Sequence, residues 1–199
     1  MALPAGIERR SEGDDRPETP ARAPWRDHVA KARRGDRQAF TALHAAFGRL
    51  VHAVIITRVG PADAKDLVQD VFLTMWQKLE TLEDDQAFPA WLTQLARSRA
   101  ARHLRDAKPT EALDDEPGLA APDRSSTPDA KKVLKALQAL PEAYGETLAM
   151  RLVEGMSGPE IAERTGLTPG SVRVNLHRGM KLLREKLGLP PAEEGPGDE

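Results

Sequence analysis

Apolar side chains recur at intervals of three and four residues through the first half of the chain, from Trp25 to Lys108. This spacing places them on one face of an α-helix. After a break at Gly35-Asp36, a long helix is predicted by the apolar positions Phe40, Leu43, Phe47, Leu50, Val51 and Val54. A second helix follows Gly60-Pro61, with its apolar face at Leu67, Val68, Val71, Phe72, Met75, Trp76 and Leu79.

A polar stretch, TLEDDQA from Thr81 to Ala87, interrupts the helical spacing and predicts a loop. The spacing resumes in FPAWLTQLARSRAARHLRD, where Pro89 fits the first turn of a helix. Phe88 and Trp91 open this amphipathic helix, so we expect both rings to pack in the core rather than to stack on a ligand.

The helical pattern is lost between Pro109 and Pro128, where the sequence reads PTEALDDEPGLAAPDRSSTP. Prolines, acidic side chains and the lack of an apolar period are typical of an extended linker. Helical spacing returns from Asp129 to Leu187. We therefore expect an all-α protein with five parts: a disordered extension (1–23), a first helical domain (24–108), a flexible acidic Pro-rich linker (109–128), a second helical domain (129–188) and an acidic tail (189–199).

The composition excludes several classes of site. The 199 residues include no cysteine, which excludes disulfides, thiolate zinc sites and cysteine redox switches. The N-terminus lacks the apolar segment of a signal peptide, and no apolar run is expected to span a bilayer, so we expect a cytoplasmic protein without membrane insertion. The formal net charge of −2 argues against a nucleic-acid partner only if the charge is spread evenly, and it is not.

Capping signals near the C-terminus predict two helices joined by a tight turn. Ser157 and Glu160 have the spacing of a capping box. Gly166 lies where a helix end favours a left-handed residue, and Thr168 followed by Pro169 fits the start of the next helix. This arrangement is typical of a helix-turn-helix.

The second of these helices has an apolar face and a basic face. The positions expected to face inward are Val172, Leu176, Gly179 and Leu183. The positions left facing outward are Arg173, Val174, His177, Arg178 and Lys181. In a helix-turn-helix this helix enters the major groove, where arginine can donate two hydrogen bonds to guanine and lysines can meet phosphates. The alternative is a helical hairpin whose basic face is only solvated.

The chain resembles the extracytoplasmic-function sigma factors, the minimal two-domain sigma subunits of bacterial RNA polymerase. Three segments in series show it: DAKDLVQDVFLTMWQKL, FPAWLTQLARSRAARHLRD and LPEAYGETLAMRLVEGMSGPEIAERTGLTPGSVRVNLHRGMKLLREKL. The first two look like sigma region 2 and the last looks like region 4. The resemblance implies an alternative sigma factor that binds core polymerase, recognises the −35 and −10 promoter elements and promotes opening of the duplex.

The resemblance also implies a polymerase-binding surface, formed here by Asp66, Gln69 and Asp70. Spacing of three and four puts these side chains on one helix face. The polymerase sites implied are the clamp coiled coil of the largest subunit and the flap. A solvated acidic face is the alternative, since such faces are common.

Basic side chains follow the next helix at Arg97, Arg99, Arg102 and Arg105. A basic helix beside a polar loop suits single-stranded DNA, because backbone charge supplies the affinity. In the family, the loop holds a flipped base of the −10 element, which makes Asp84, Asp85 and Gln86 candidates for reading that base. A solvated basic surface is the alternative.

The chain departs from the family pattern in both DNA-binding segments. Ser98 and Arg102 stand where the family often has Asn and Asp, and Val174 and Asn175 stand where Ser and Arg are frequent. The family's −10 and −35 sequence preferences therefore do not carry over.

The resemblance places the linker in the active-centre cleft and RNA exit path of polymerase. There we expect Asp114, Asp115 and Glu116 to mimic nascent RNA, because carboxylates would occupy a channel built for phosphates. Family members are commonly held by an anti-sigma factor between the two domains, so such a protein is a further expected partner.

No enzyme motif occurs in the chain: GxxxxGK[ST], HExxH and GxSxG are all absent. His44 and His52 are too far apart along a helix for a simple ligand pair, so no metal, cofactor or catalytic residue is expected. Two other classes stay open, a stand-alone helix-turn-helix regulator that binds duplex DNA without polymerase, and a protein-interaction module. The first gives the acidic helix no role, and the second gives the basic helix none.

Overall fold

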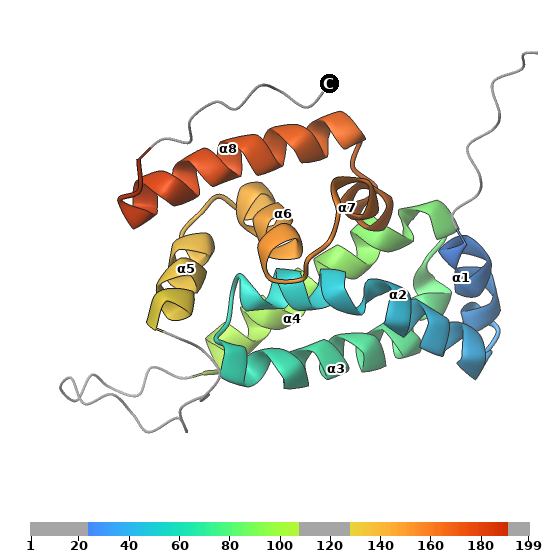
Figure 1. The fold of residues 1–199 in the computed structure, drawn as a ribbon. Helices are drawn as coiled ribbons and strands as arrows, with labels where there is room; N and C mark the ends of the chain where they lie inside the picture. The colour runs from blue at the N-terminus through green and yellow to red at the C-terminus, as the bar shows by residue number, and fades with distance from the viewer. Residues whose placement is uncertain (1–23, 108–127, 191–199) are drawn as a thin grey trace, which may run out of the picture.

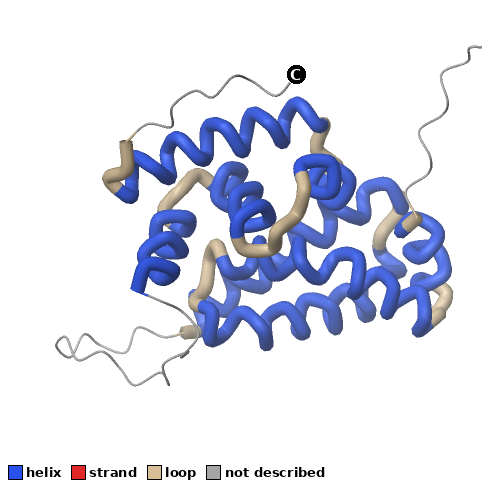
Figure 2. Tube along the Cα trace, in the orientation of Figure 1, coloured by secondary structure: helices blue, strands red, loops and turns tan. Residues whose placement is uncertain are grey.

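The computed structural model describes residues 24–107 and 128–190. These residues form eight α-helices and two short 3-10 turns, and no strand occurs among them (Figure 1, Figure 2). The all-α prediction is confirmed for this part of the chain. The N-terminal extension, most of the predicted linker with Asp114, Asp115 and Glu116, and most of the acidic tail lie outside the described residues.

The first half contains four helices and both turns: α1 (Trp25–Arg33), α2 (Arg37–Ile56), α3 (Pro61–Lys78), η1 (Leu79–Thr81), η2 (Asp85–Ala87) and α4 (Phe88–Asp106). The breaks predicted from the sequence are found. Asp36 caps α2 by accepting hydrogen bonds from two backbone N–H groups of its first turn. Gly60 precedes α3, and Pro61 occupies the first turn of that helix.

The second half contains four helices: α5 (Pro128–Gln138), α6 (Glu142–Leu152), α7 (Gly158–Thr165) and α8 (Pro169–Leu187). Ser157 and Glu160 form the predicted capping box at the start of α7. Gly166 ends that helix with φ of 75°, in the left-handed region. Thr168 caps α8 by accepting a hydrogen bond from the backbone N–H of Ser171. The helix-turn-helix of α7 and α8 is therefore built from the capping signals that predicted it.

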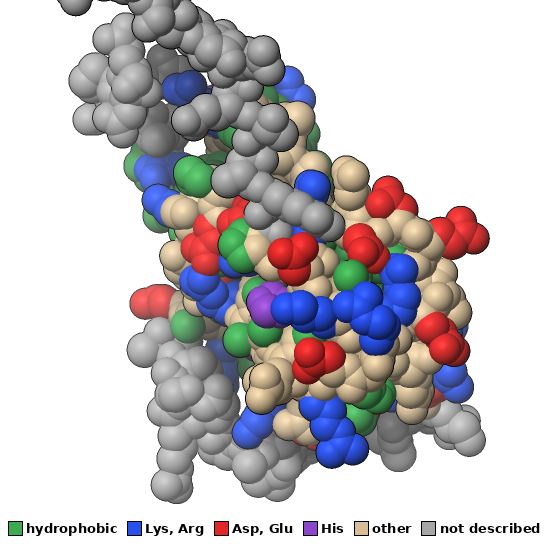
Figure 3. Space-filling view, turned by 90° about the vertical axis from the view of Figure 1, so that its right-hand side faces the viewer, with side chains coloured by type: hydrophobic (Ala, Val, Ile, Leu, Met, Phe, Trp, Pro, Cys, Tyr) green, Lys and Arg blue, Asp and Glu red, His purple; other side chains and the backbone are tan. Residues whose placement is uncertain are grey.

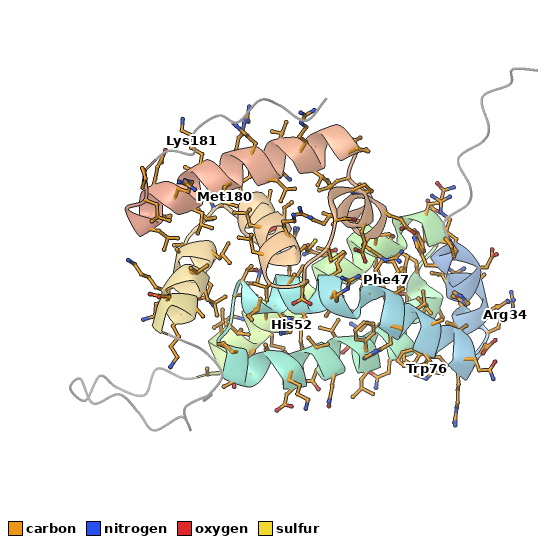
Figure 4. The ribbon with its side chains drawn as sticks, viewed as in Figure 1. Arg34, Phe47, His52, Trp76, Met180 and Lys181 are labelled. Atoms are coloured by element: carbon orange, nitrogen blue, oxygen red, sulfur yellow. The ribbon has the colours of Figure 1, made fainter. Side chains whose placement is uncertain are left out.

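α2 is the central helix of the first half. Phe47 lies near the middle of this helix and is fully buried (Figure 4). The Phe47 ring packs edge to face with the rings of Trp25 and Phe88, with centroid distances of 5.6 and 5.0 Å. Phe88 is fully buried, and Trp91 packs partly buried against the same cluster, so the prediction that both belong to the core is confirmed. This aromatic group joins α1, α2 and α4.

α2 is also, within residues 24–107 and 128–190, the single helix long and apolar enough to cross a membrane by length and composition, with a mean hydropathy of 1.5. Half of that apolar stretch is buried inside the protein. Helices α1, α3, α4 and α6 pack around it, so the core accounts for its apolar character.

The two halves of the chain pack against each other and share one hydrophobic core. Figure 1 shows α6 and α7 between α8 and the layer that contains α2 and α4. Met150 of α6, with Met156 and Ile161, belongs to the same buried cluster as the side chains of α2. The sequence predicted two helical domains but not this contact between them. Burial of these apolar side chains favours the compact arrangement.

α8 packs on α5 and α6 through a second buried cluster, formed by Leu137, Leu140, Leu148 and Leu183. Gly179 permits the close approach, because a Cβ at this position would lie 3.0 Å from Cδ1 of Leu148 and 3.2 Å from Cβ of Tyr144. The contact fixes which face of α8 is turned away from the protein.

Candidate nucleic-acid interface

The outer face of α8 is basic and exposed. One shallow hollow on this face is lined by Arg173, Val174, His177 and Arg178, all exposed. Lys181 continues the face and projects away from the body of the protein (Figure 4). Of the four positions predicted to face inward, Val172, Gly179 and Leu183 are buried, and Leu176 packs partly buried against the core. A packed helix therefore presents all five candidates of the sequence analysis to solvent.

The three candidates on α3 are not equivalent. Asp66 and Gln69 are exposed, and no hydrogen bond to another described residue holds their side chains. Asp70 is partly buried and accepts a hydrogen bond from Arg99 of α4. The free part of this face therefore consists of Asp66 and Gln69, while Asp70 links α3 to the basic helix.

The loop at residues 79–87, between α3 and α4, is held by its own acidic side chains. Asp84 accepts a hydrogen bond from the backbone N–H of Gln86 at 2.8 Å. Asp85 accepts one from the guanidinium of Arg33 in α1, at 2.5 Å. The side chain of Gln86 is exposed and has no hydrogen bond to another described residue. The three candidates lie together, but two of them hold the shape of the loop.

The four arginines of α4 fall into two pairs. Arg102 and Arg105 are exposed, and Arg102 is only loosely paired within its own helix. Arg99 is bound to Asp70, as described above, and Arg97 is bound by the second half of the chain. The α4 face expected to meet DNA is therefore partly occupied by protein contacts.

Arg97 is held by a carboxylate of α6. Its Nε and Nη2 atoms donate to the two carboxylate oxygens of Glu146, at 3.0 and 2.8 Å. The hydrogen bond to Glu146 raises the pKa of Arg97 above its usual value, while burial acts in the opposite direction. The geometry is the two-bond fork that makes arginine–carboxylate pairs strong.

Glu146 lies at the centre of a charged cluster between the two halves. It is 5% exposed, and a carboxylate oxygen lies 2.7 Å from Nη1 of Arg58 in the first half. Glu142, one turn earlier, lies 2.6 Å from Arg58 and 2.9 Å from Arg97. The sequence analysis did not identify this cluster. Its one local signal was that Glu146 is the single charged residue in the stretch 143–150.

Further polar contacts join the halves. The side chain of Gln138 donates hydrogen bonds to the carbonyl oxygens of Ile56 and Val59, at 2.9 and 3.0 Å. The carbonyl of Ile56 lies at the C-terminal end of α2, where a helix leaves backbone acceptors unpaired, and that of Val59 lies in the turn that follows. His52 of α2 lies 2.5 Å from a carboxylate oxygen of Glu154. The contact between the halves is therefore polar as well as apolar.

The histidines considered in the sequence analysis have protein neighbours. The ring of His44 lies 4.3 Å from that of Phe72, and His52 pairs with Glu154 as described. Among the residues that the structure describes, no group of three His, Asp or Glu side chains could hold a metal ion.

Two family models match this chain, one in each half. The model described as Sigma-70 region 2 matches residues 43–110, and the model described as Sigma-70, region 4 matches residues 130–183. The first match begins inside α2, so α1 lies outside it. The second match contains α7 and most of α8, which together form the helix-turn-helix.

Curated relatives extend over most of the chain. The RNA polymerase sigma factor CarQ of Myxococcus xanthus is 33% identical over 166 residues, which cover 80% of this chain and 95% of CarQ. The ECF RNA polymerase sigma factor SigF of Caulobacter vibrioides is 31% identical over 157 residues, or 77% of this chain and 88% of SigF. The solved structure of CnrH in complex with the cytosolic domain of CnrY shares the fold, with a TM-score of 0.52 at 24% identity, covering 82% of this chain and 96% of CnrH. The chain therefore belongs to the extracytoplasmic-function family of RNA polymerase sigma factors, proteins of transcription initiation that bind core polymerase and promoter DNA.

Proposed function

We propose that this sigma factor divides its work between two surfaces on opposite edges of the fold. The exposed face of α3, with Asp66 and Gln69, docks on the clamp coiled coil of the largest polymerase subunit. The outer face of α8 reads the −35 element. Because α3 and α8 lie at opposite edges (Figure 1), one partner leaves the other surface accessible.

The orientation of α8 is the observation that carries this proposal. Its apolar face is fixed against α5 and α6, and no described residue is hydrogen-bonded to the side chains of Arg173, His177 or Arg178. A guanidinium can donate two parallel hydrogen bonds to guanine in the major groove. Lys181, further along the helix, suits a phosphate, which adds affinity without sequence choice.

The −10 element meets the first half at the loop 79–87 and the exposed arginines of α4, Arg102 and Arg105. The side of the molecule on which α1 lies shows a group of Lys and Arg side chains with acidic ones around it (Figure 3). The loop lies beside α1, so positive charge there supports the approach of a DNA strand to the loop, whereas Arg102 and Arg105 lie near the other end of α4 (Figure 1). Arg97 and Arg99 join this surface when their carboxylate partners release them.

The remaining roles follow from the sequence and the family. The linker with Asp114, Asp115 and Glu116 enters the RNA path of polymerase, and the second half of the chain meets the flap. The protein acts in the cytoplasm and supplies no catalytic group. An anti-sigma factor that lies between the domains would have to separate α6 and α7 from α2, because these helices pack together directly.

Run-off transcription tests the proposal. The purified chain, mixed with bacterial core polymerase and genomic fragments, should direct transcripts from discrete start sites that core polymerase alone does not use. The chain without core should bind the same promoters much more weakly. If the chain alone binds them as tightly as the holoenzyme does, it is a stand-alone regulator, and if no start site depends on it, the proposal is wrong.

A further inference from the structure

We propose that Arg33 of α1 positions the loop 79–87, and that this contact leaves Gln86 as the side chain with which the loop reads a base of the −10 element. The inference rests on the proposed function, because it requires the loop to meet promoter DNA. It assigns a role to a helix that precedes the residues matched by the region 2 model, 43–110.

Arg33 holds the loop at two points. Its Nη2 atom donates to the carbonyl oxygen of Leu82 at 2.6 Å and to Oδ1 of Asp85 at 2.5 Å. The side chain is partly buried, at 30% exposure, so solvent screens these contacts less than it would at an open surface. One guanidinium thus fixes both the backbone and a side chain of a loop that lies about fifty residues away in the sequence.

Apolar side chains at the start of α1 and in the loop are also buried in the core. Trp25, at the start of α1, packs its ring 6.0 Å from that of Phe88, the residue that follows the loop. Leu79 and Leu82 are 1% and 5% exposed, so both ends of the η1 turn are buried. α1 contacts both short turns of the loop. The helix α1 therefore contacts the loop at several positions and not through Arg33 alone.

These contacts distinguish the three candidate readers. The carboxylate of Asp84 is engaged by a backbone N–H of the loop, and that of Asp85 by Arg33. Gln86 is left with an exposed amide that offers both donors and an acceptor, as the edge of a base does. A loop already fixed in shape loses less conformational entropy when a base binds, which favours binding. Arg33 therefore acts on base reading through the loop, and Gln86 acts by contact.

The experiment uses the holoenzyme and a promoter library in which each −10 position carries each of the four bases in turn. Initiation is measured for the wild type and for Gln86→Ala, Arg33→Ala and Arg33→Lys. Arg34→Ala is the matched control, because Arg34 follows directly at the end of α1 but is exposed and directed away from the body of the protein (Figure 4). Core binding and the free energy of unfolding are measured for every variant.

Gln86→Ala should abolish discrimination at one −10 position, a loss of roughly tenfold or more. Arg33→Ala should weaken discrimination at that same position, and Arg33→Lys should lie between Arg33→Ala and the wild type, with core binding unchanged in all three. A uniform loss of initiation at every −10 sequence in Arg33→Ala would make Arg33 a purely structural residue and overturn the inference. So would an unaltered base profile in Gln86→Ala. Either result leaves the proposed function standing if the wild type initiates with a −10 preference. A wild type that shows no −10 preference contradicts both this inference and the proposed function.

Discussion

Arg97 of α4 and Glu146 of α6 are joined by two parallel hydrogen bonds, 3.0 and 2.8 Å long, across the contact between the two halves of the chain. The carboxylate of Glu146 holds the guanidinium that we assign to DNA, as a phosphate would. If Arg97 contacts DNA as we propose, Glu146 must first release it, which requires α6 to move away from α4. The compact arrangement and the DNA-bound arrangement compete for the same arginine.

Replacing Glu146 by Gln should loosen this contact. The amide keeps the size of the side chain but loses the charge that Arg58 and Arg97 share. We expect the free energy of unfolding to fall by about 1.5–3 kcal/mol, because hydrogen bonds to charged groups contribute in that range, while Glu142 keeps both arginines partly paired. Urea denaturation measures the change.

The distance between the halves gives a second measurement. Because the chain has no cysteine, one cysteine in place of Gln77 on α3 and one in place of Lys186 on α8 can be labelled without background. Energy transfer between the dyes should fall in Glu146→Gln but not in Glu185→Gln, the same change at an exposed site of α8. Equal values for both variants would show that the charged cluster does not hold the halves together.

The strength of this ion pair should not change across the neutral pH range. The pKa of Arg97 is raised by Glu146, so its contribution to stability is fully present below the pKa of an unfolded arginine and is lost only as pH rises through the still higher folded value. Both values lie far above neutrality. Because His52 also meets a carboxylate across the halves, energy transfer is compared in a His52→Gln background at mildly acidic and mildly alkaline pH. A sharp opening on the alkaline side of neutrality in that background would contradict the prediction.

Features that depend on residues close together in the sequence were predicted correctly. Ser157, Gly166 and Thr168 act within one helical turn, so their capping roles could be predicted and the outward face of α8 followed. The pairing of Arg97 with Glu146 joins residues 49 positions apart, and no periodic pattern reports such a contact. For the same reason the sequence offered Asp85 as a candidate for reading a base, without showing that Arg33 binds its carboxylate.

Gly179→Ala should destabilise the packing of α8 on α6. The added methyl would lie 3.0 Å from Leu148 and 3.2 Å from Tyr144, closer than ordinary contact. Overpacking of this kind lowers the free energy of unfolding by about 1–3 kcal/mol. Chemical denaturation of the variant measures the change. Gly48→Ala is the matched control, because Gly48 is also helical but has open space around it. There we expect a gain of about 0.5–1 kcal/mol from helix propensity.

Destabilisation at Gly179 should also reduce binding at the −35 element, since the α8 face that we propose to read DNA depends on this contact for its direction. If Gly179→Ala is as stable as Gly48→Ala, then α8 has room to shift, and the close approach does not fix its orientation.

Replacing Asp66 and Gln69 together by Ala should weaken binding to core polymerase. Both side chains are exposed and make no contact that stabilises the fold, so stability should change by less than about 0.5 kcal/mol. Binding is measured by pull-down or fluorescence anisotropy with purified core. Asp129→Asn, an exposed carboxylate at the start of α5, is the control and should bind like the wild type. Unaltered core binding in the double variant would move the docking surface away from this face of α3.

Replacing Arg173 and Arg178 together by Ala should remove sequence choice at the −35 element while leaving core binding intact. Each arginine that pairs with a guanine contributes about 1–3 kcal/mol of discrimination, so holoenzyme should lose roughly tenfold or more of its preference among −35 variants. Lys135→Ala removes an exposed cation from α5 and should keep the preference.

The salt dependence separates the roles further, because loss of a phosphate contact such as Lys181 lowers the slope of affinity against salt without altering the preference. If the arginine variant instead loses core binding as severely as the Asp66 and Gln69 variant does, the two surfaces are not separate, because removing guanidinium groups from α8 cannot by itself disturb a carboxylate face on α3.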